Sequence, residues 1–142
     1  MFKDILLPVD LNHENSWRKS LPIAIALCRM EGANLHLLAV IPQFGPSMVS
    51  QYFPENFEEE ATEHMMEALH EFTRAHMPPD IKVQHIVAHG AIYDEILRAA
   101  ASIASDLIVI GAHRPDLKDY MIGSNASRVV RHAKCSVLIA RD

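Results

Sequence analysis

The amino-acid sequence predicts an α/β fold: one domain, residues 1–142, in which an open, parallel, five-stranded sheet of Rossmann-like type carries helices on both faces. Short apolar segments alternate along the chain with longer segments of helical periodicity. Several of the short segments are apolar throughout, which is typical of parallel strands that are covered from both sides. The chain has the length of one ordinary domain and shows no internal repeat.

The first third of the chain predicts two strands and a helix. Residues 2–9 form a short apolar segment that includes a proline, which indicates a strand. Asn15 or Ser16 can cap a helix that runs to about residue 30, with apolar side chains three and four residues apart on one face. Residues 35–41 are almost wholly apolar, as expected for a buried parallel strand.

The middle of the chain predicts a loop followed by a long helix. Residues 43–56 contain one glycine and two prolines without a sustained period, so we expect a mobile loop. Its length makes it a candidate flap beside a binding site. Residues 57–76 combine an apolar stripe with three glutamates in the first turn, where negative charge stabilises a helix.

The remaining segments continue the alternation of strands and helices. Residues 81–88 alternate apolar and polar side chains, which favours a strand near an edge of the sheet. The simplest arrangement of five strands that alternate with four helices is a parallel sheet with right-handed crossovers. The other expected elements are a helix at 91–105, a strand at 107–110, a loop at 112–122, a helix at 124–132 and a strand at 136–140.

Composition excludes several classes of protein. The formal net charge of -5 argues against nucleic-acid and anionic-membrane partners, which require a basic surface. An acidic residue precedes the first short apolar run, and no segment approaches the roughly 20 apolar residues of a membrane span. We therefore expect a cytoplasmic location. Cys28 and Cys135 lie in apolar segments, so we interpret them as reduced core residues.

The sequence favours a binding protein over an enzyme. It contains no Gly-x-Ser-x-Gly elbow, no Cys-x-x-Cys pair and no complete Walker loop, which argues against an efficient hydrolase or kinase. His64 and its acidic neighbours fall at helical spacings, but a metal site would more convincingly show cysteine and histidine pairs. We interpret that group as a solvated helix face.

Ligands of open parallel sheets bind outside the carboxyl ends of the strands, so the residues that follow each strand are the candidates. In this sequence they include Pro8, Val9, Asp10, Val40, Gly111, His113 and Arg114. Gly123, Ser124 and Asn125 then open the last predicted helix, where free amides and the helix dipole can bind phosphate. The alternative is that Ser124 only caps the helix and Gly123 only turns the chain.

The chain resembles the universal stress protein family along its whole length. The resemblance rests on the opening Ile-Leu-Leu-Pro-Val-Asp at 5–10, the strand that ends at Gly111, the Gly-Ser pair, and the closing Cys-Ser-Val-Leu-Ile at 135–139. Nucleotide-binding members carry a glycine, two residues, a second glycine, nine residues, and then glycine with serine or threonine. Here Arg114 occupies the place of the second glycine, and the interval to Gly123 is one residue shorter.

The resemblance implies an adenine-nucleotide site. The Gly-Ala-His-Arg-Pro-Asp loop at 111–116 resembles a bacterial branch that still binds ATP. By this resemblance Asp10 lies near the ribose and Val40 near the adenine of ATP, ADP or AMP. The implied phosphate contacts are Gly111, His113, Arg114, Gly123, Ser124 and Asn125. Asp10 is the one plausible Mg²⁺ contact, although an aspartate at the end of a strand often only binds loop amides.

The resemblance also implies a function and a partner. The implied function is a stress-response regulatory module that binds nucleotide with at most slow hydrolysis. The last strand, Ser136–Ala140, is an expected edge strand and therefore a homodimer interface. A nucleotide-free dimeric interaction module of the same fold is the alternative, with Arg114 blocking the pocket. An adenylate-forming enzyme ranks last, because no glycine-serine loop follows the first strand.

Overall fold

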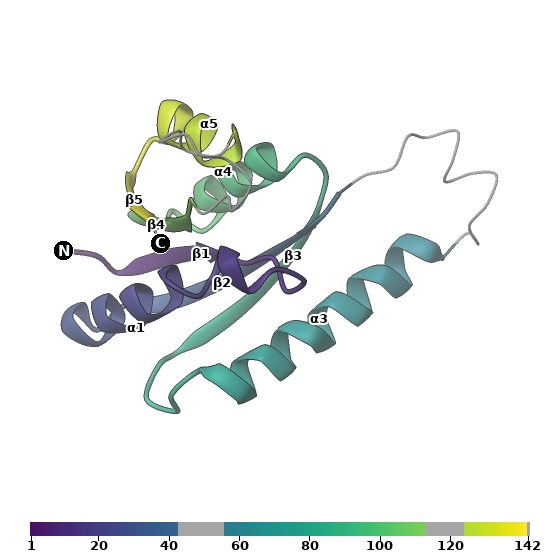
Figure 1. Cartoon of the computed structure of the whole chain (residues 1–142), viewed down its shortest axis with the longest axis horizontal. Coiled ribbons are helices and arrows are strands. Elements are labelled where there is room, and N and C mark those ends of the chain that lie inside the picture. Colours follow the sequence, from purple (N-terminus) through teal and green to yellow (C-terminus); the bar gives the residue numbers. More distant parts are fainter. Residues whose placement is uncertain (43–55, 113–123, 142) are drawn as a thin grey trace.

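A computed structural model describes residues 1–42, 56–112 and 124–141, and it contains a parallel five-stranded sheet of order β3-β2-β1-β4-β5 (Figure 1). The strands are β1 (Asp4–Pro8), β2 (Asn34–Ile41), β3 (Val83–His89), β4 (Leu107–Gly111) and β5 (Ser136–Ala140). The α-helices are α1 (Ser20–Glu31), α3 (Phe57–His76), α4 (Ile92–Ser102) and α5 (Ser124–His132). The predicted fold class is confirmed.

The chain reverses its direction of winding at the centre of the sheet. From β1 it adds β2 and β3 on one side, and then it returns to add β4 and β5 on the other side. Ile5 pairs with Leu35 of β2 and with Leu107 of β4, which fixes the register on both sides of β1. The predicted edge positions of β3 and β5 are confirmed, and the ends of β1 and β4 diverge where ligands of such sheets bind.

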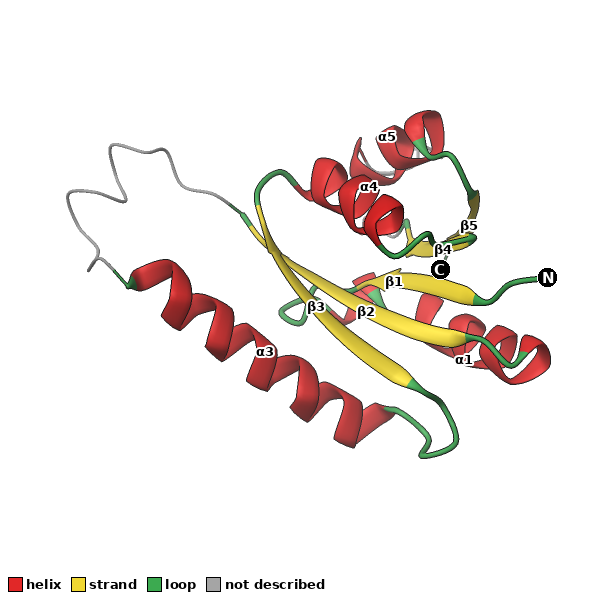
Figure 2. Ribbon diagram, turned by 180° about the vertical axis from the view of Figure 1, so that it is seen from behind, coloured by secondary structure: helices red, strands yellow, loops and turns green. Residues whose placement is uncertain are grey.

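The sheet separates two apolar clusters, because successive strand residues point to opposite faces. Leu7 lies in the cluster beneath α1 and α3, together with Leu69 and Phe72 of α3. Leu6 lies in the other cluster, which α4 and α5 cover. Figure 2 shows α3 and α1 on one side of the sheet and α4 with α5 on the other. Each fully buried leucine contributes about 1.5–3 kcal/mol relative to exposure.

The helix α1 begins later than the sequence prediction. We expected a start at Asn15 or Ser16, but a short 3₁₀ turn occupies that place and the α-helix begins at Ser20. Pro22 explains the difference, since proline has no N–H to donate to the carbonyl four residues earlier and fits only in the first turn of a helix. The proline was visible in the sequence, and it argued for this later start.

The helix α4 ends before the predicted boundary, at Ser102. Ala104 adopts a left-handed φ of 53°. The N–H of Ser105 donates to the carbonyl of Ala100 (2.9 Å), and the N–H of Ala104 donates to that of Ala101 (3.2 Å). These two bonds form a Schellman motif, whose left-handed position usually holds glycine. Backbone hydrogen bonds therefore end the helix α4 at Ala104, although alanine is strained in a left-handed conformation.

The two cysteines are unpaired. Cys28 is buried in α1, and burial raises the pKa of its thiol to about 11, so it packs as a small apolar side chain. Cys135 is only half-buried, and its pKa is raised by burial as well. Within the described ranges, no helix combines the length and apolar character that a membrane span requires.

Candidate functional site

A cavity of about 470 Å³ lies at the carboxyl edge of the sheet, beside the divergence of β1 and β4. Its volume falls in the range typical of small-molecule sites. Six of the ten sequence-predicted residues line it: Pro8, Val9, Asp10, Val40, Gly111 and Asn125. The fold thus brings together segments that lie more than a hundred residues apart in the sequence.

Of the other four predicted residues, the structure describes one, Ser124. Ser124 is the first residue of α5, next to the cavity-lining Asn125. His113, Arg114 and Gly123 lie outside the described residues.

The deep part of the cavity is apolar. Val9 directly after β1, Leu38 of β2 and Ile110 of β4 are buried in its lining, and so is Ile96 of α4, which shares an apolar cluster with Leu38 and Ile110. Ile92, at the start of α4, is a large apolar residue that remains 38% exposed at the cavity wall. An apolar slot of this kind suits a flat aromatic base, whose faces gain from leaving water.

Sequence reasoning missed several lining residues. They are Leu11, Asn12, Ser16, Leu38, Ala39, Met65, Ile92, Ile96, Ile110 and Ala126. Ile41, Pro42 and Ala112, which the sequence also places just after strands, line the cavity as well. Neighbours of a predicted residue on the same strand could have been included by extension. Ile92 and Ile96 could have been found from the apolar stripe of a helix that follows a strand end. Met65 could not, because only tertiary packing brings the middle of α3 to this place.

Asp10 organises the turn that follows β1. Its Oδ1 accepts a hydrogen bond from the N–H of Asn12 (3.0 Å), and its Oδ2 lies 2.9 Å from Nδ1 of His13. The N–H of Asp10 donates to Oγ of Ser16 (2.9 Å). The local role that we had considered as the alternative is therefore present. Carboxylate oxygens accept several hydrogen bonds, so Asp10 retains capacity for a ligand hydroxyl.

Gly111 has a packing role besides its place in the cavity wall. A Cβ atom at this position would lie 2.5 Å from the carbonyl oxygen of Ser16, a backbone atom that cannot rotate away. The end of β4 therefore touches the turn after β1, and only glycine permits this contact. The resemblance implied a phosphate contact at Gly111, whereas the structure provides a steric reason that does not involve a ligand.

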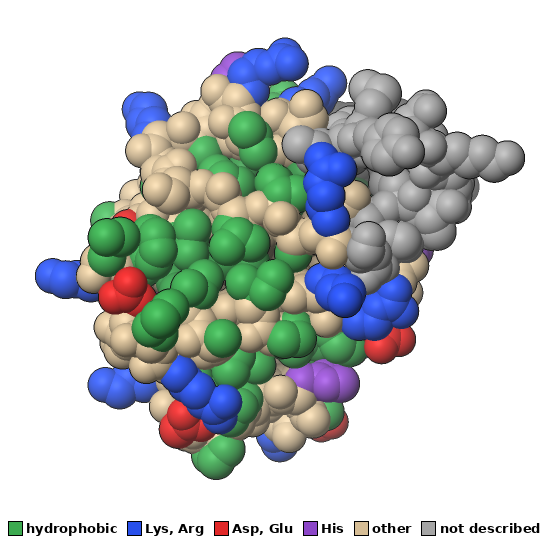
Figure 3. Space-filling model, turned by 60° about the vertical axis from the view of Figure 1, so that its left-hand side comes forward, with side chains coloured by type: hydrophobic (Ala, Val, Ile, Leu, Met, Phe, Trp, Pro, Cys, Tyr) green, Lys and Arg blue, Asp and Glu red, His purple; other side chains and the backbone are tan. Residues whose placement is uncertain are grey.

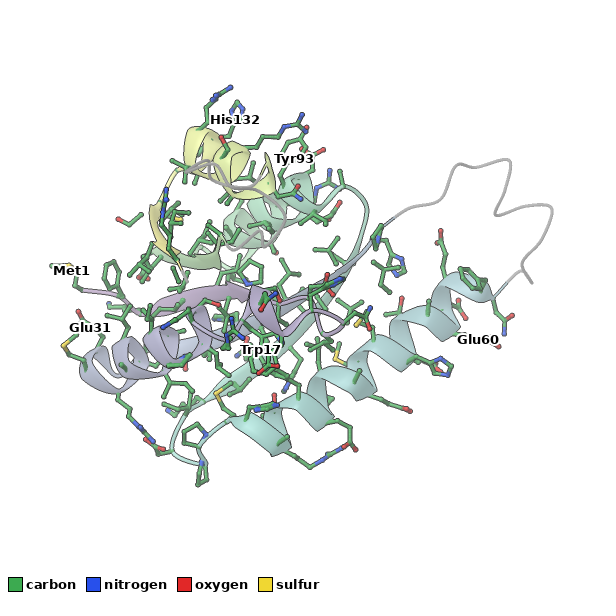
Figure 4. The ribbon with its side chains drawn as sticks, in the orientation of Figure 1. Met1, Trp17, Glu31, Glu60, Tyr93 and His132 are labelled. Carbon is green, nitrogen blue, oxygen red and sulfur yellow. The ribbon has the colours of Figure 1, made fainter. Side chains whose placement is uncertain are left out.

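The first turn of α5 faces the cavity. Asn125 and Ala126 line the wall, and the first amides of an α-helix have no partner within the helix. The helix dipole adds partial positive charge at this end. The first turn of α5 therefore suits an anion. One turn later, outside the lining of the cavity, the guanidinium of Arg128 lies 4.6 Å from the ring centre of Tyr93, which is labelled in Figure 4.

Metal binding has little support here. Within the described ranges, no group of three or more histidine, cysteine, aspartate or glutamate side chains is arranged to hold a metal ion. Asp10 is an oxygen donor at the cavity, but its two oxygens already contact Asn12 and His13.

A second feature lies along β5, at the edge of the sheet. Val137, Leu138 and Ile139 are only partly buried, and the neighbouring Val130 of α5 is 46% exposed. Apolar side chains gather on the face turned forward in Figure 3, the side on which β5 and the N-terminus lie in Figure 1. An edge strand with apolar side chains offers unpaired backbone groups to a further strand.

The fold and the cavity together define an α/β protein with a cavity at the carboxyl edge of a doubly wound parallel sheet, where ligands of such sheets bind. A model of the universal stress protein family matches residues 1–141. The chain belongs to the universal stress protein family, as the sequence resemblance had indicated.

Individual relatives agree with this assignment. Universal stress protein G of Escherichia coli O157:H7 is 32% identical over an alignment 147 residues long, gaps included. The alignment covers 99% of this chain and 100% of the relative. The solved UspA of Lactobacillus plantarum is 25% identical, with a TM-score of 0.72 over 99% of this chain and 98% of that one. The crystal structure of a universal stress protein in complex with cAMP shares the fold, at 17% identity and a TM-score of 0.66, covering 99% and 97%.

Proposed function

We propose that this universal stress protein binds ATP or a related adenine nucleotide in the cavity and acts as a cytoplasmic stress-response regulatory module. The observation that carries the proposal is a single cavity wall in which an apolar slot adjoins the first turn of α5. The slot suits a base, and the helix start suits phosphate. A nucleotide carries a base at one end and phosphates at the other.

Each part of the nucleotide has a complementary surface. The adenine enters the slot beside Val9 and Val40, and the ribose lies near the carboxylate of Asp10. The phosphates approach the amides of Ser124 and Asn125, with Gly123, His113 and Arg114 completing the contacts in the segment before α5. Binding of a neutral base in an apolar slot, and of an anion at the start of a helix, requires no catalytic group.

The proposed role is binding, with at most slow hydrolysis. Efficient phosphoryl transfer requires a positioned base and carboxylates that hold Mg²⁺ beside the phosphates. The described cavity offers Asp10 alone among acidic residues. Mg²⁺ bound to the nucleotide is compatible with the proposal, and its effect on affinity is measurable.

The homodimer is the second part of the proposal. Partly exposed apolar side chains on β5 and the open edge of the sheet support a two-fold interface in which the β5 strands of two copies meet. The same surface also supports the alternative function, a dimeric interaction module that binds no nucleotide.

Calorimetric titration with ATP, ADP, AMP and GTP tests the nucleotide proposal. We expect Asp10→Asn to weaken ATP binding by about tenfold, because a hydrogen bond to a charged group is lost while the amide still accepts from Asn12. Asp94→Asn, an exposed acid in the first turn of α4, is the matched control and should not change the affinity. Gly123→Val should abolish binding.

Two results would contradict the proposal. One is unchanged affinity in both Asp10→Asn and Gly123→Val. The other is the absence of binding to any nucleotide by a wild-type protein that also releases none when the purified material is denatured. The second result would favour the nucleotide-free interaction module.

A further inference from the structure

The edge strand β3 carries two histidines on the face that packs against α3. Val83, His85, Val87 and His89 alternate with residues of the opposite face, and the two valines belong to the apolar cluster beneath α3. Apolar side chains are the usual occupants of such positions. Histidines there introduce groups that titrate near neutral pH into an interface between a helix and a sheet.

Each histidine is bonded to a threonine of α3. Nε2 of His85 lies 2.7 Å from Oγ1 of Thr73, and Nε2 of His89 lies 2.6 Å from Oγ1 of Thr62. The hydroxyl of Thr62 also donates to the carbonyl of Glu58 (2.7 Å), so it accepts from His89, whose Nε2 carries a proton. The hydroxyl of Thr73 has no other hydrogen bond among the described residues, so it is free to donate to Nε2 of a neutral His85. A bond in that direction, unlike the bond from His89, cannot form when the ring of His85 is charged.

His85 also faces a second histidine. The ring of His70, on α3, lies over it with the centroids 4.0 Å apart and the planes 36° apart. Partial burial lowers the pKa of His85, and the charge that His70 can carry lowers it further. The neutral ring of His85 is therefore the form that fits this interface.

The charged groups around His85 are few. On α3, Glu67, Glu71 and Arg74 flank His70 at the outer surface, and Arg74 is paired with Glu71. On β2, the residue opposite His85 is Leu37, and α4 covers the other face of the sheet. The remaining titratable group on this face of β3 is His89, four residues further along. Within the described ranges, no carboxylate forms an ion pair with His85.

The helix α3 is held by a small buried surface. Among its twenty residues, all of them described, only Leu69 and Phe72 are buried. Figures 1 and 2 show α3 as a long helix beside β3, separate from α4 and α5. Both buried side chains lie in the C-terminal half of α3, so these two residues and the His85–Thr73 bond together hold that half on the sheet.

We propose that protonation of His85 loosens the packing of the C-terminal half of α3 on β3, while the Thr62–His89 bond remains as a pivot. Charging His85 places a cation against the ring of His70, whose centroid lies 4.0 Å away, and leaves no acceptor at the Nε2 atom that faces Thr73. The bond from His89 persists, because its Nε2 is a donor in the neutral and in the charged ring. The molecule thus contains an acid-sensitive latch on the face opposite α4 and α5, and it does not depend on nucleotide.

The direction of the pH effect follows from the lowered pKa. Between the pKa of His85 in the folded protein and 6.5, its ordinary value, the loosened state binds more protons than the packed state. The packing of α3 on β3 is therefore strongest above about pH 6.5, and it weakens as the pH falls below this value. The latch responds in the range of mild acidification.

Amide hydrogen exchange of the full-length protein tests the latch. We expect the exchange rates of amides in residues 68–76, corrected for intrinsic pH dependence, to rise about tenfold between about pH 7.5 and about pH 5.5. Amides of α4 and α5 should not follow. Trp17, the single tryptophan of the sequence, contacts Phe72 and His76 and should shift its fluorescence to the red over the same range.

Variants separate the latch from general acid effects. His85→Gln keeps a partner for Thr73 but cannot be charged, so the rise in exchange should disappear. His70→Gln, at an exposed position, should move the transition to lower pH because the repulsion is gone. His64→Gln, exposed on the same helix, is the matched control and should behave as wild type.

Three results would overturn the proposal. The first is an exchange rate in residues 68–76 of the wild-type protein that does not change with pH. The others are a pH transition in His70→Gln, or in His85→Gln, that is the same as in wild type. Exchange decides between the outcomes, because Trp17 also contacts His76 and its fluorescence can change without any loosening of α3.

Discussion

At the scale of single residues, steric contacts account for features that motif reasoning assigns to a ligand. Gly111 matches the first glycine of a phosphate-binding pattern, yet its missing Cβ is explained by the carbonyl oxygen of Ser16. Asp10 likewise has a local role, because its carboxylate accepts from Asn12. Both residues line the cavity, so packing and binding place constraints on the same atoms.

The contact at Gly111 predicts a loss of stability in Gly111→Ala. The added methyl group would lie 2.5 Å from a backbone oxygen, so β4 or the turn after β1 must move. We expect the free energy of unfolding to fall by about 1–3 kcal/mol, measured by urea denaturation. Ala112→Ser, at the next position, is the control for a small change in side-chain size, and equal urea midpoints for the two variants would refute the steric explanation.

The left-handed Ala104 predicts the opposite effect for Ala104→Gly. Glycine removes the Cβ strain of the left-handed conformation, while its larger entropy in the unfolded chain offsets part of the gain. We expect thermal unfolding to show a stabilisation of about 0.5–1 kcal/mol. Ala101→Gly, inside α4 and exposed, should destabilise by about 1 kcal/mol, and a shared sign for the two variants would contradict this account.

At the scale of elements, the alternation of strands and helices was predictable and the helix boundaries were less so. The bounds of α3, α5 and β5 agree with the prediction, because each has a clear apolar pattern. The start of α1 was misplaced although Pro22 was visible, and the end of α4 depends on backbone hydrogen bonds that sequence patterns do not show. The cavity edge followed from the strand ends, whereas the contribution of Met65 required tertiary packing.

The start of β1 shows how polar groups join elements at the edge opposite the cavity. Oδ1 of Asp4 lies 2.9 Å from Nε2 of His36, which is buried in β2. The carboxylate of Asp106, just before β4, accepts from the N–H groups of Lys3 and Asp4 at 2.8 and 3.2 Å. Nδ1 of His36 is buried and has no partner among the described residues, so the ring depends on Asp4 for its one hydrogen bond.

This arrangement predicts a pH dependence of stability. The hydrogen bond from His36 lowers the pKa of Asp4 below its ordinary value of 3.8. A lowered carboxyl pKa stabilises the fold above about 3.8, and the stabilisation is lost as the pH falls through the lower value of the folded state. Urea denaturation between about pH 5 and about pH 2.5 should show this loss in wild type and a smaller one in Asp4→Asn; equal slopes for the two proteins would exclude the mechanism.

At the scale of the whole molecule, the two edges of the sheet differ. The edge strand β3 packs against α3, whereas β5 presents partly exposed apolar side chains at the other edge. An interface of copies that meet through β5 leaves no equivalent surface for a third copy, so association closes at two.

The proposed dimer makes a prediction for Val137→Lys. A charge on the open edge strand should convert the dimer to a monomer in analytical ultracentrifugation. Gln84→Lys, which adds the same charge at an exposed position of the opposite edge strand, should remain dimeric. A monomeric wild type, or a Val137→Lys protein that stays dimeric, would rule out this interface.

The separation of the two apolar clusters by the sheet has a consequence for signalling. Looser packing on one side of the sheet leaves most of the apolar cluster on the other side undisturbed, because the two clusters share no buried side chain. The surface that α3 presents can therefore change while the packing beneath α4 and α5 is kept, and the cavity can respond to such a change only through Met65 and the other residues that it shares with the α3 side.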